Sequence, residues 1–181
     1  KAAGLSVNAE GRTLDISDGD GNRQLRLDLA SMRRHGDLRL GFEAAGEQHF
    51  YGLGHGGAGL DRLGVTRRFW NCHVNYGAGA DIAIPLLLSD KGYGLFFDDP
   101  TLSLLDPGPS GDAICFDYVT PANSIDLYLL MGDGLAGTLG LVAQLLGRAS
   151  MPPRWALGYL QSTRHFESRE ELLEVAGGFA E

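Results

Sequence analysis

The chain has 181 residues, of which 44% are hydrophobic and 21% are charged, and its formal net charge is −8. A chain of this length buries about 70% of its unfolded surface, so it can form a sizeable core. The negative charge without any basic block argues against a nucleic-acid-binding protein, and no apolar run reaches the roughly 20 residues that span a bilayer.

The first forty residues alternate between polar and apolar side chains, in short runs separated by turn signals. The clearest run is 23–29, in which Leu25, Leu27 and Leu29 share one face. It follows the sequence D-G-D-G-N at 18–22, which is typical of a turn. A period of two predicts antiparallel strands with one face in the core and the other in solvent.

Short strands are predicted to continue as far as residue 130. The runs are 67–71, 81–89, 93–98, 102–105, 113–119 and 124–130. The run 81–89 is apolar throughout, which indicates a strand buried on both faces, and Lys91-Gly92 predicts the turn of a hairpin. Strands and turns at this spacing favour a β-sandwich.

Three aspects of side-chain placement follow from the same patterns. Trp70 and Trp155 are expected in the core because of their size. Asp98 and Asp99 are neighbours at a strand end, so they are expected to be solvated turn residues with opposite orientations rather than a catalytic pair. The two cysteines fit free thiols, since two are too few for a disulfide framework.

The character of the sequence changes after residue 133. Leu135, Leu139 and Val142 recur at helical spacing and predict an amphipathic helix over 134–148, with Gly147 at its C-cap.

A proline-containing linker separates this helix from the last segment. The apolar run 155–160 predicts a strand, and Ser168 followed by Glu171 predicts the capped start of a helix over 168–181. One strand and one helix do not make a domain, because the strand has nothing to pair with. We therefore expect the natural protein to continue beyond residue 181.

A set of motifs in fixed order between residues 50 and 161 resembles glycoside hydrolase family 31, the α-glucosidase and α-xylosidase family. The motifs are Y-G-L-G-H at 51–55, L-D-R-L-G at 60–64, F-W-N at 69–71, I-P-L at 84–86, K-G-Y-G-L-F-F at 91–97, L-L-G-R at 145–148, P-P-R-W-A-L-G at 152–158 and Q-S at 161–162. No single motif is specific, but the ordered set is.

The resemblance implies a mainly β fold that agrees with the periodicity. It implies a galactose-mutarotase-like antiparallel β-sandwich over 1–133, a connecting helix and proline linker over 134–154, and the first strand and helix of a truncated (β/α)8 barrel over 155–181.

The resemblance also implies a retaining α-glycosidase, which uses two carboxylates. In this family both carboxylates lie late in the barrel, and no position of this chain matches either motif. The chain alone is therefore expected to be inactive. The family implies no cofactor and no metal.

Substrate-binding positions are carried over from the resemblance. In the family a sandwich loop reaches over the barrel mouth, and His73 stands where the family has the Asp of its W-N-R-D motif. Gln161, Arg164 and His165 follow the first barrel strand, whose end faces the active site in such barrels. Arg164 and His165 replace the aromatic residue that the family places there.

The implied partners are a carbohydrate substrate and the missing C-terminal barrel of the same chain, with no nucleic acid and no membrane. The oligomeric state stays open, and a cytoplasmic location is expected because no leader pattern is visible.

Two other functions remain open at this point. One is a free-standing carbohydrate-binding sandwich, and the other is a mutarotase-like epimerase that would use His49, His55, His73 and Glu47. In both of these the segment 155–181 would have no role.

Overall fold

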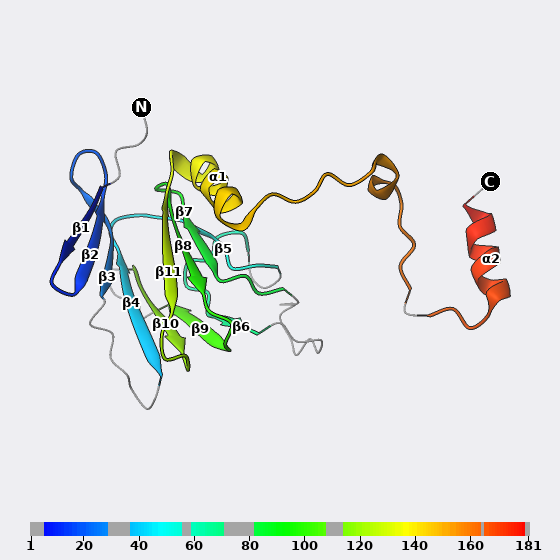
Figure 1. Ribbon diagram of the computed structural model, residues 1–181, viewed down its shortest axis with the longest axis horizontal. Coiled ribbons are helices and arrows are strands. Elements are labelled where there is room, and N and C mark those ends of the chain that lie inside the picture. The colour runs from blue at the N-terminus through cyan, green and yellow to red at the C-terminus, as the bar shows by residue number, and fades with distance from the viewer. Residues whose placement is uncertain are drawn as a thin grey trace. The chain divides into compact units, whose positions relative to one another are not determined.

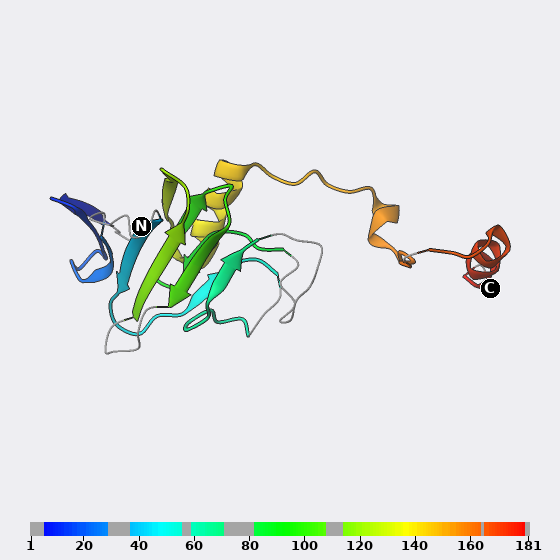
Figure 2. The same cartoon turned by 90° about the horizontal axis from the view of Figure 1, so that it is seen from below.

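The computed structural model describes residues 6–28, 37–55, 59–70, 82–107, 114–163 and 165–179. Its contacts divide the chain into two units, Lys1–Gly147 and Arg148–Glu181. The first unit consists of two β-sheets and a helix, α1, and the second contains two short helical segments (Figures 1 and 2).

In the described residues, the larger sheet has seven antiparallel strands in the order β1-β2-β3-β4-β10-β9-β6. Their bounds are β1 (Ser6–Glu10), β2 (Thr13–Ser17), β3 (Arg23–Asp28), β4 (Leu38–Ala44), β6 (Arg67–Phe69), β9 (Ser103–Pro107) and β10 (Ile114–Thr120). The smaller sheet has four described strands in the order β11-β8-β7-β5. They are β5 (Phe50–Gly52), β7 (Leu86–Ser89), β8 (Tyr93–Asp98) and β11 (Asp126–Met131).

The core lies between the two sheets. Leu25 and Leu27 of β3 are buried and the side chains between and beyond them are more exposed, so the alternating pattern does place one face inside. Phe97 of the smaller sheet packs edge-on against Phe42 at 5.6 Å between ring centroids and stacks on Tyr118 at 4.1 Å. These contacts confirm the predicted β-sandwich.

A buried glutamine joins the two sheets. The amide nitrogen of Gln48 donates to the carbonyl oxygens of Gln24 (2.7 Å) and Ala45 (2.6 Å). Its oxygen accepts from the hydroxyls of Ser89 (3.0 Å) and Tyr93 (2.7 Å). Burial raises the pKa of Tyr93, so the phenol stays a donor to the amide. All four hydrogen-bonding positions of the amide are used.

A second buried network corrects one expectation from the sequence. Asp98 is exposed as predicted, but Asp99 is not a solvated turn residue. Its carboxylate accepts from the hydroxyl of Thr101 at 2.6 Å and from that of Tyr118 at 2.9 Å. Partial burial acts to raise the pKa of Asp99, but the hydrogen bonds outweigh it and the pKa lies below its usual range. The buried Tyr118 hydroxyl thus has Asp99 as one partner, and it also lies 2.6 Å from the Ser103 hydroxyl.

The helix α1 (Gly134–Leu146) confirms a helix at the predicted place, and Gly147 is its C-cap. The predicted apolar face is not the one that packs, because the helix buries Thr138 and leaves Leu139 47% exposed. The helix packs on the smaller sheet at very close range. A Cβ at Gly132 would lie 2.2 Å from the backbone nitrogen of Thr138, and one at Gly94 of β8 would lie 3.1 Å from that threonine's methyl group. Glycine at these positions therefore lets the helix backbone approach the sheet.

The apolar run 81–89 forms a shorter strand than predicted. Only Leu86–Ser89 is a strand, and these four residues are buried as expected. Pro85 has no N–H for strand pairing, and the carbonyl of Ile82 accepts a hydrogen bond from the backbone of His55 instead (2.7 Å). Residue 81 lies outside the described residues.

The second unit does not contain the predicted strand over 155–160. Instead, Arg154–Leu157 form a 3-10 helix, η1, with a hydrogen bond from Gly158 N to Trp155 O (3.2 Å). A single strand has no neighbour here to complete its backbone hydrogen bonds, so the segment satisfies them locally.

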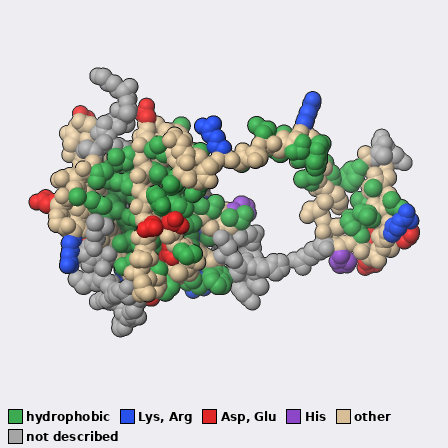
Figure 3. All heavy atoms as spheres, viewed as in Figure 1, with side chains coloured by type: hydrophobic (Ala, Val, Ile, Leu, Met, Phe, Trp, Pro, Cys, Tyr) green, Lys and Arg blue, Asp and Glu red, His purple; other side chains and the backbone are tan. Residues whose placement is uncertain are grey.

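Both tryptophans are exposed, which contradicts the expectation of a core position. Trp70 is 53% exposed and Trp155 is 77% exposed, and Leu157, Tyr159 and Leu160 beside Trp155 are exposed as well. Hydrophobic side chains are visible on the surface of this unit (Figure 3). A large side chain becomes buried only when another element packs over it. In the part of the chain that the structure describes, no element covers the two tryptophans.

The final helix agrees with its predicted cap. The helix α2 runs over Arg169–Gly178, and the Ser168 hydroxyl accepts from the backbone N–H of Glu171 at 3.0 Å. The Glu171 side chain accepts in turn from the backbone N–H of Glu167 at 2.7 Å. The serine and the glutamate thus bind backbone donors at the start of the helix.

Candidate functional site

The Y-G-L-G-H motif forms a tight turn at the end of β5. Gly52, Leu53 and Gly54 all have positive φ angles, and the Leu53 side chain is buried in the core. A Cβ at Gly54 would lie 2.1 Å from the carbonyl oxygen of Ile82, so only glycine fits there. The glycines of the motif are therefore required by the close contact between this turn and the segment before β7.

Two arginines hold this turn through its carbonyl groups. Arg62 donates to the carbonyl oxygens of Gly52 (3.1 Å) and Gly54 (3.3 Å). Arg67 donates from one nitrogen to the carbonyl oxygens of His55 (2.9 Å) and Ile82 (3.0 Å). We call residues 52–55 with these two side chains the arginine-bound turn.

Arg67 is an unusual side chain for this position. It is only 7% exposed, and its Nε atom has no hydrogen-bond partner. Burial, together with the nearby charge of Arg62, lowers the pKa of Arg67. Its two carbonyl contacts tie the turn at His55 to the segment before β7 at Ile82.

An exposed histidine–aspartate pair lies at the start of β5. The Nδ1 atom of His49 is 2.7 Å from the carboxylate of Asp61. That carboxylate also accepts from the backbone N–H groups of Phe50 (3.1 Å) and Leu63 (3.0 Å). The hydrogen bond to Asp61 raises the pKa of His49. Partial burial acts to raise the pKa of Asp61, but its hydrogen bonds dominate and lower it.

The structure describes two of the four predicted substrate-binding residues, Gln161 and His165. His73 and Arg164 lie outside the described residues. His165 is exposed, and its backbone carbonyl accepts from the Thr163 hydroxyl at 3.2 Å. Gln161 is exposed too, and its side-chain oxygen accepts from the Tyr159 hydroxyl at 2.6 Å. Of the two that the structure describes, Gln161 therefore has a side-chain contact, and no hydrogen bond joins Gln161 to His165.

Gln161 lines a hollow of about 490 Å³ in the second unit. The hollow lies between the segment 159–166 and α2, and its lining is mainly apolar. The rings of Tyr159 and Phe179 pack at 4.8 Å between centroids at one part of it. The other lining residues are Phe166, Leu172, Val175 and Ala176. A polar amide beside an apolar wall is a common composition for a binding site.

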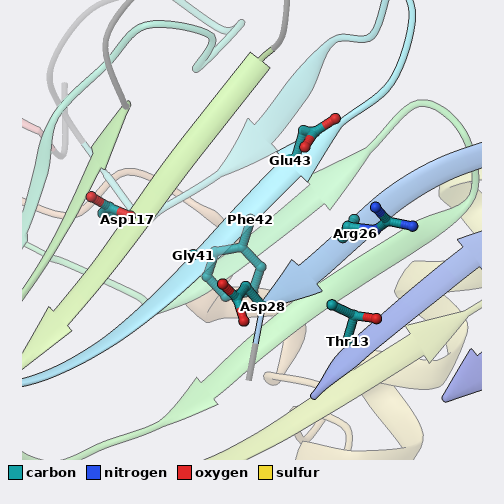
Figure 4. Close-up of a pocket in the computed structure, with 7 residues that line it drawn as sticks. All are labelled: Thr13, Arg26, Asp28, Gly41, Phe42, Glu43 and Asp117. Carbon is teal, nitrogen blue, oxygen red and sulfur yellow. The ribbon is translucent and has the colours of Figure 1, made fainter. Parts of the chain in front are cut away.

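A second hollow, of about 280 Å³, lies over β2, β3, β4 and β10 of the larger sheet (Figure 4). Its lining residues are Gly41, Phe42, Thr13, Arg26, Asp28, Glu43 and Asp117. Two of these charges are already paired: Arg26 with Asp15 at 2.7 Å and Glu43 with Arg23 at 2.8 Å. Because ion pairs on the sheet occupy these groups, we assign this hollow no function.

Among the described residues, no helix is both long and apolar enough to cross a membrane. The described histidine, cysteine and acidic residues also form no cluster of three or more that could hold a metal ion.

Comparison with known proteins decides the family. The model of the glycosyl hydrolase 31 N-terminal galactose mutarotase-like domain matches residues 3–106, more than half of the chain. The chain belongs to glycoside hydrolase family 31. It is 33% identical over 142 residues to alpha-glucosidase 2 of Bacillus thermoamyloliquefaciens and 29% identical over 144 residues to an alpha-xylosidase of Saccharolobus solfataricus.

Solved structures of family 31 share the fold. The GH31 dextranase of Flavobacterium johnsoniae superposes with a TM-score of 0.80 at 22% identity, over 97% of this chain and 24% of the dextranase. The two relatives above are matched over 74% and 77% of this chain. The chain spans only 18% and 19% of their respective lengths.

Proposed function

We propose that this chain is the N-terminal part of a retaining α-glycosidase that hydrolyses or transfers α-linked glycosyl residues. The single observation that supports this most strongly is the family match over residues 3–106, together with relatives that are named alpha-glucosidase and alpha-xylosidase. In this proposal the nucleophile and the acid/base carboxylate lie in a (β/α)8 barrel further along the parent protein. The two partners of this chain are that barrel and the carbohydrate substrate.

Four described carboxyl groups are engaged in structural hydrogen bonds rather than in a pair suited to glycoside cleavage. A retaining glycosidase needs one carboxylic acid that stays protonated until it donates to the leaving oxygen, which requires a raised pKa. The described carboxyl groups with a displaced pKa are Asp15, Asp18, Asp61 and Asp99, and in all four the pKa is lowered. Each is an acceptor in a turn, a strand pair or a buried network instead.

The exposed apolar residues of the second unit support a division into a sandwich (1–133), a connecting helix and linker (134–154) and a first barrel βα unit (155–181). In that arrangement the segment 155–160 pairs with other barrel strands in the parent, which would cover its side chains. A free-standing carbohydrate-binding sandwich gives this segment no purpose, so we do not favour that function.

Substrate contact is assigned to four residues that form part of the pocket wall. His73 follows the Trp70 end of the larger sheet, while Gln161, Arg164 and His165 follow the first barrel strand. Imidazole, amide and guanidinium groups can donate hydrogen bonds to sugar hydroxyls, and the first two can also accept them.

The assignment is tested in the full-length protein with aryl α-glucoside and α-xyloside substrates. We expect His73→Ala and Arg164→Ala each to lower kcat/KM by about tenfold or more, as the loss of one hydrogen bond to a sugar hydroxyl would. His35→Ala is the matched control, since none of the family motifs includes residue 35. Unchanged kcat/KM in both variants would remove these residues from the pocket, and equal loss in the control would point to a general effect on folding.

A further inference from the structure

The smaller sheet ends at β5, where it is apolar on both of its faces (Figure 1). All four residues of the neighbouring strand β7 are buried, and β5 pairs with that strand from Phe50 opposite Ser89 to Gly52 opposite Leu87. In the described residues, no strand pairs with the other edge of β5. An open edge on an apolar sheet is a template for pairing with another chain, and proteins close such edges with loops, charges or bulges.

The chain returns along this edge after the arginine-bound turn. The carbonyl oxygen of Phe50 accepts from the backbone N–H of Arg62 at 2.7 Å, and the N–H of Phe50 donates to the Asp61 carboxylate at 3.1 Å. The Arg62 side chain donates to the carbonyl oxygen of Gly52 at 3.1 Å. Because backbone groups alternate between the two edges of a strand, Phe50 and Gly52 are the residues that would bind a further strand. We call residues 61–63, which occupy these groups, the edge strap.

The edge strap closes the sheet without becoming a strand itself. A further strand would accept the Phe50 N–H with a backbone carbonyl and would then present a second open edge of its own. Here the acceptor is a side-chain carboxylate, which also accepts from the Leu63 N–H at 3.0 Å and lies 2.7 Å from Nδ1 of His49. The charges of Asp61 and Arg62 at the edge oppose pairing with another chain as well.

We propose that the edge strap is a guard that keeps β5 from pairing with β5 of a second copy of this protein. Opening the strap removes its hydrogen bonds from the N–H and C=O groups of Phe50 and from the C=O group of Gly52. In an antiparallel pair of two β5 strands, these groups bind their counterparts in the second copy. The two four-stranded sheets then join into one continuous sheet.

The β5 edge is self-complementary, which favours a second copy over another protein as the partner. A two-fold axis at Tyr51 brings Phe50 of each copy opposite Gly52 of the other, and no like charges meet. The edge of the larger sheet at β1 is polar instead, since residues 7–10 are exposed and include Glu10. The proposal rests on the sandwich alone, so its failure would leave the proposed glycosidase function untouched.

The test is sedimentation velocity of the full-length protein and its variants over roughly 5 to 200 µM. Relative to the wild type, the double variant Asp61→Ala/Arg62→Ala should show an added, reversible self-association with Kd on the order of 100 µM. Asp61→Asn keeps an oxygen that accepts the Phe50 N–H and should sediment like the wild type. The matched control is Asp15→Ala/Arg26→Ala, which removes an ion pair of 2.7 Å inside the larger sheet and opens no edge.

A cross-link locates the new contact. In the proposed pair the two copies of residue 51 face each other with about 4.5 Å between their Cα atoms, which is within reach of a disulfide. Tyr51→Cys should therefore give a disulfide-linked dimer in the double variant, identified by mass spectrometry, and much less of it when the edge strap is intact. Circular dichroism checks folding, and Asp61→Ala alone is used in the same way if the double variant is unfolded.

Three results would overturn the proposal. The first is a folded strap variant that associates no more than the wild type. The second is equal association of the control variant, which would point to general destabilisation. The third is a disulfide dimer that forms equally well with the edge strap intact.

Discussion

Gln48 connects the two sheets through hydrogen bonds to Gln24, Ala45, Ser89 and Tyr93, and it does so without access to water because its side chain is buried. An apolar side chain in its place would remove one hydrogen bond from each of these four groups. The Gln24 carbonyl would still accept from the backbone N–H of Ala45 (3.0 Å) and the Ser89 hydroxyl from that of Lys91 (3.1 Å), whereas the Ala45 carbonyl and the Tyr93 hydroxyl would lose the bonds that the amide makes to them. The cost of such orphaned groups is larger than the net gain from any one of the hydrogen bonds.

We therefore expect Gln48→Leu to lower the free energy of unfolding by about 3 kcal/mol. Urea unfolding monitored by fluorescence measures this. The control is Gln24→Leu, whose amide only reaches the exposed turn at Asp18 and whose loss should cost less than about 0.5 kcal/mol. Equal losses in the two variants would contradict the role of the buried amide.

The pair of His49 and Asp61 makes the stability of the sandwich depend on pH. The pKa of His49 is raised first by the hydrogen bond to Asp61 and then by the charges of Asp61, Asp90 and Glu47. Its contribution is therefore complete below the unfolded pKa of about 6.5 and is lost as the pH rises through the higher folded value. The pKa of Asp61 is lowered, so its contribution is present above about pH 4 and is lost as the pH falls.

We expect the urea midpoint of the wild type to decrease as the pH rises from 6 to 9, and His49→Gln to reduce that decrease. Salt should weaken the effect, because the pair is exposed. His165→Gln in the second unit is the control and should follow the wild-type profile. A wild-type midpoint that increases over this range would show that the pair is not what titrates.

At the level of secondary structure, two glycines at α1 differ in the space around them, and only one of them affects the contact between the helix and the smaller sheet. Gly132 has no room for a side chain, since a Cβ would lie 2.2 Å from the backbone of Thr138. Gly140 lies within the same helix, and a Cβ there would meet nothing within 4 Å. One glycine is required by packing, and the other only lowers helix propensity.

Gly132→Ala should therefore cost about 2 kcal/mol or more, because the helix must move away from β8 and β11. Gly140→Ala should raise the free energy of unfolding by about 0.5–1 kcal/mol, because alanine is the better helix former. Thermal or urea unfolding measures both changes. A Gly132→Ala variant as stable as Gly140→Ala would contradict the close packing of the helix.

Elements could be predicted from the sequence where they carry their own signal. The strands of the larger sheet alternate because one face is in solvent, and α2 begins with the Ser168 cap. The run 155–160 has an equally clear strand composition, but a strand needs a neighbour, and in this chain it has none. The strand β5 was not predicted, because its three residues are too few to show a period.

The candidate site was less predictable than the fold. The glycines of the Y-G-L-G motif indicate a tight turn. The binding of its carbonyl groups by Arg62 and Arg67 could not be predicted, because these contacts join residues that are eight or more positions apart. Trp70 was expected in the core on its size alone and lies mostly in solvent. Single side chains are placed by their neighbours in space, and composition does not show those neighbours.

At the scale of the whole molecule, a sandwich with a packed core is followed along the chain by a second unit, most of whose large hydrophobic side chains are exposed. The chain spans 18% of the length of a family 31 alpha-glucosidase and 24% of a family 31 dextranase. In the part of the chain that the structure describes, hydrogen bonds outweigh burial and lower the pKa values of Asp15, Asp18, Asp61 and Asp99, which serve in turns, a strand pair and a buried network.

The most direct test is the release of nitrophenol from 4-nitrophenyl α-glucoside and α-xyloside by the purified 181-residue chain, beside the full-length protein under the same conditions. We predict turnover by the full-length protein and no release above background by the 181-residue chain. Release that rises in proportion to the concentration of the 181-residue chain, and that follows its peak in gel filtration, would contradict the claim that the catalytic carboxylates lie elsewhere.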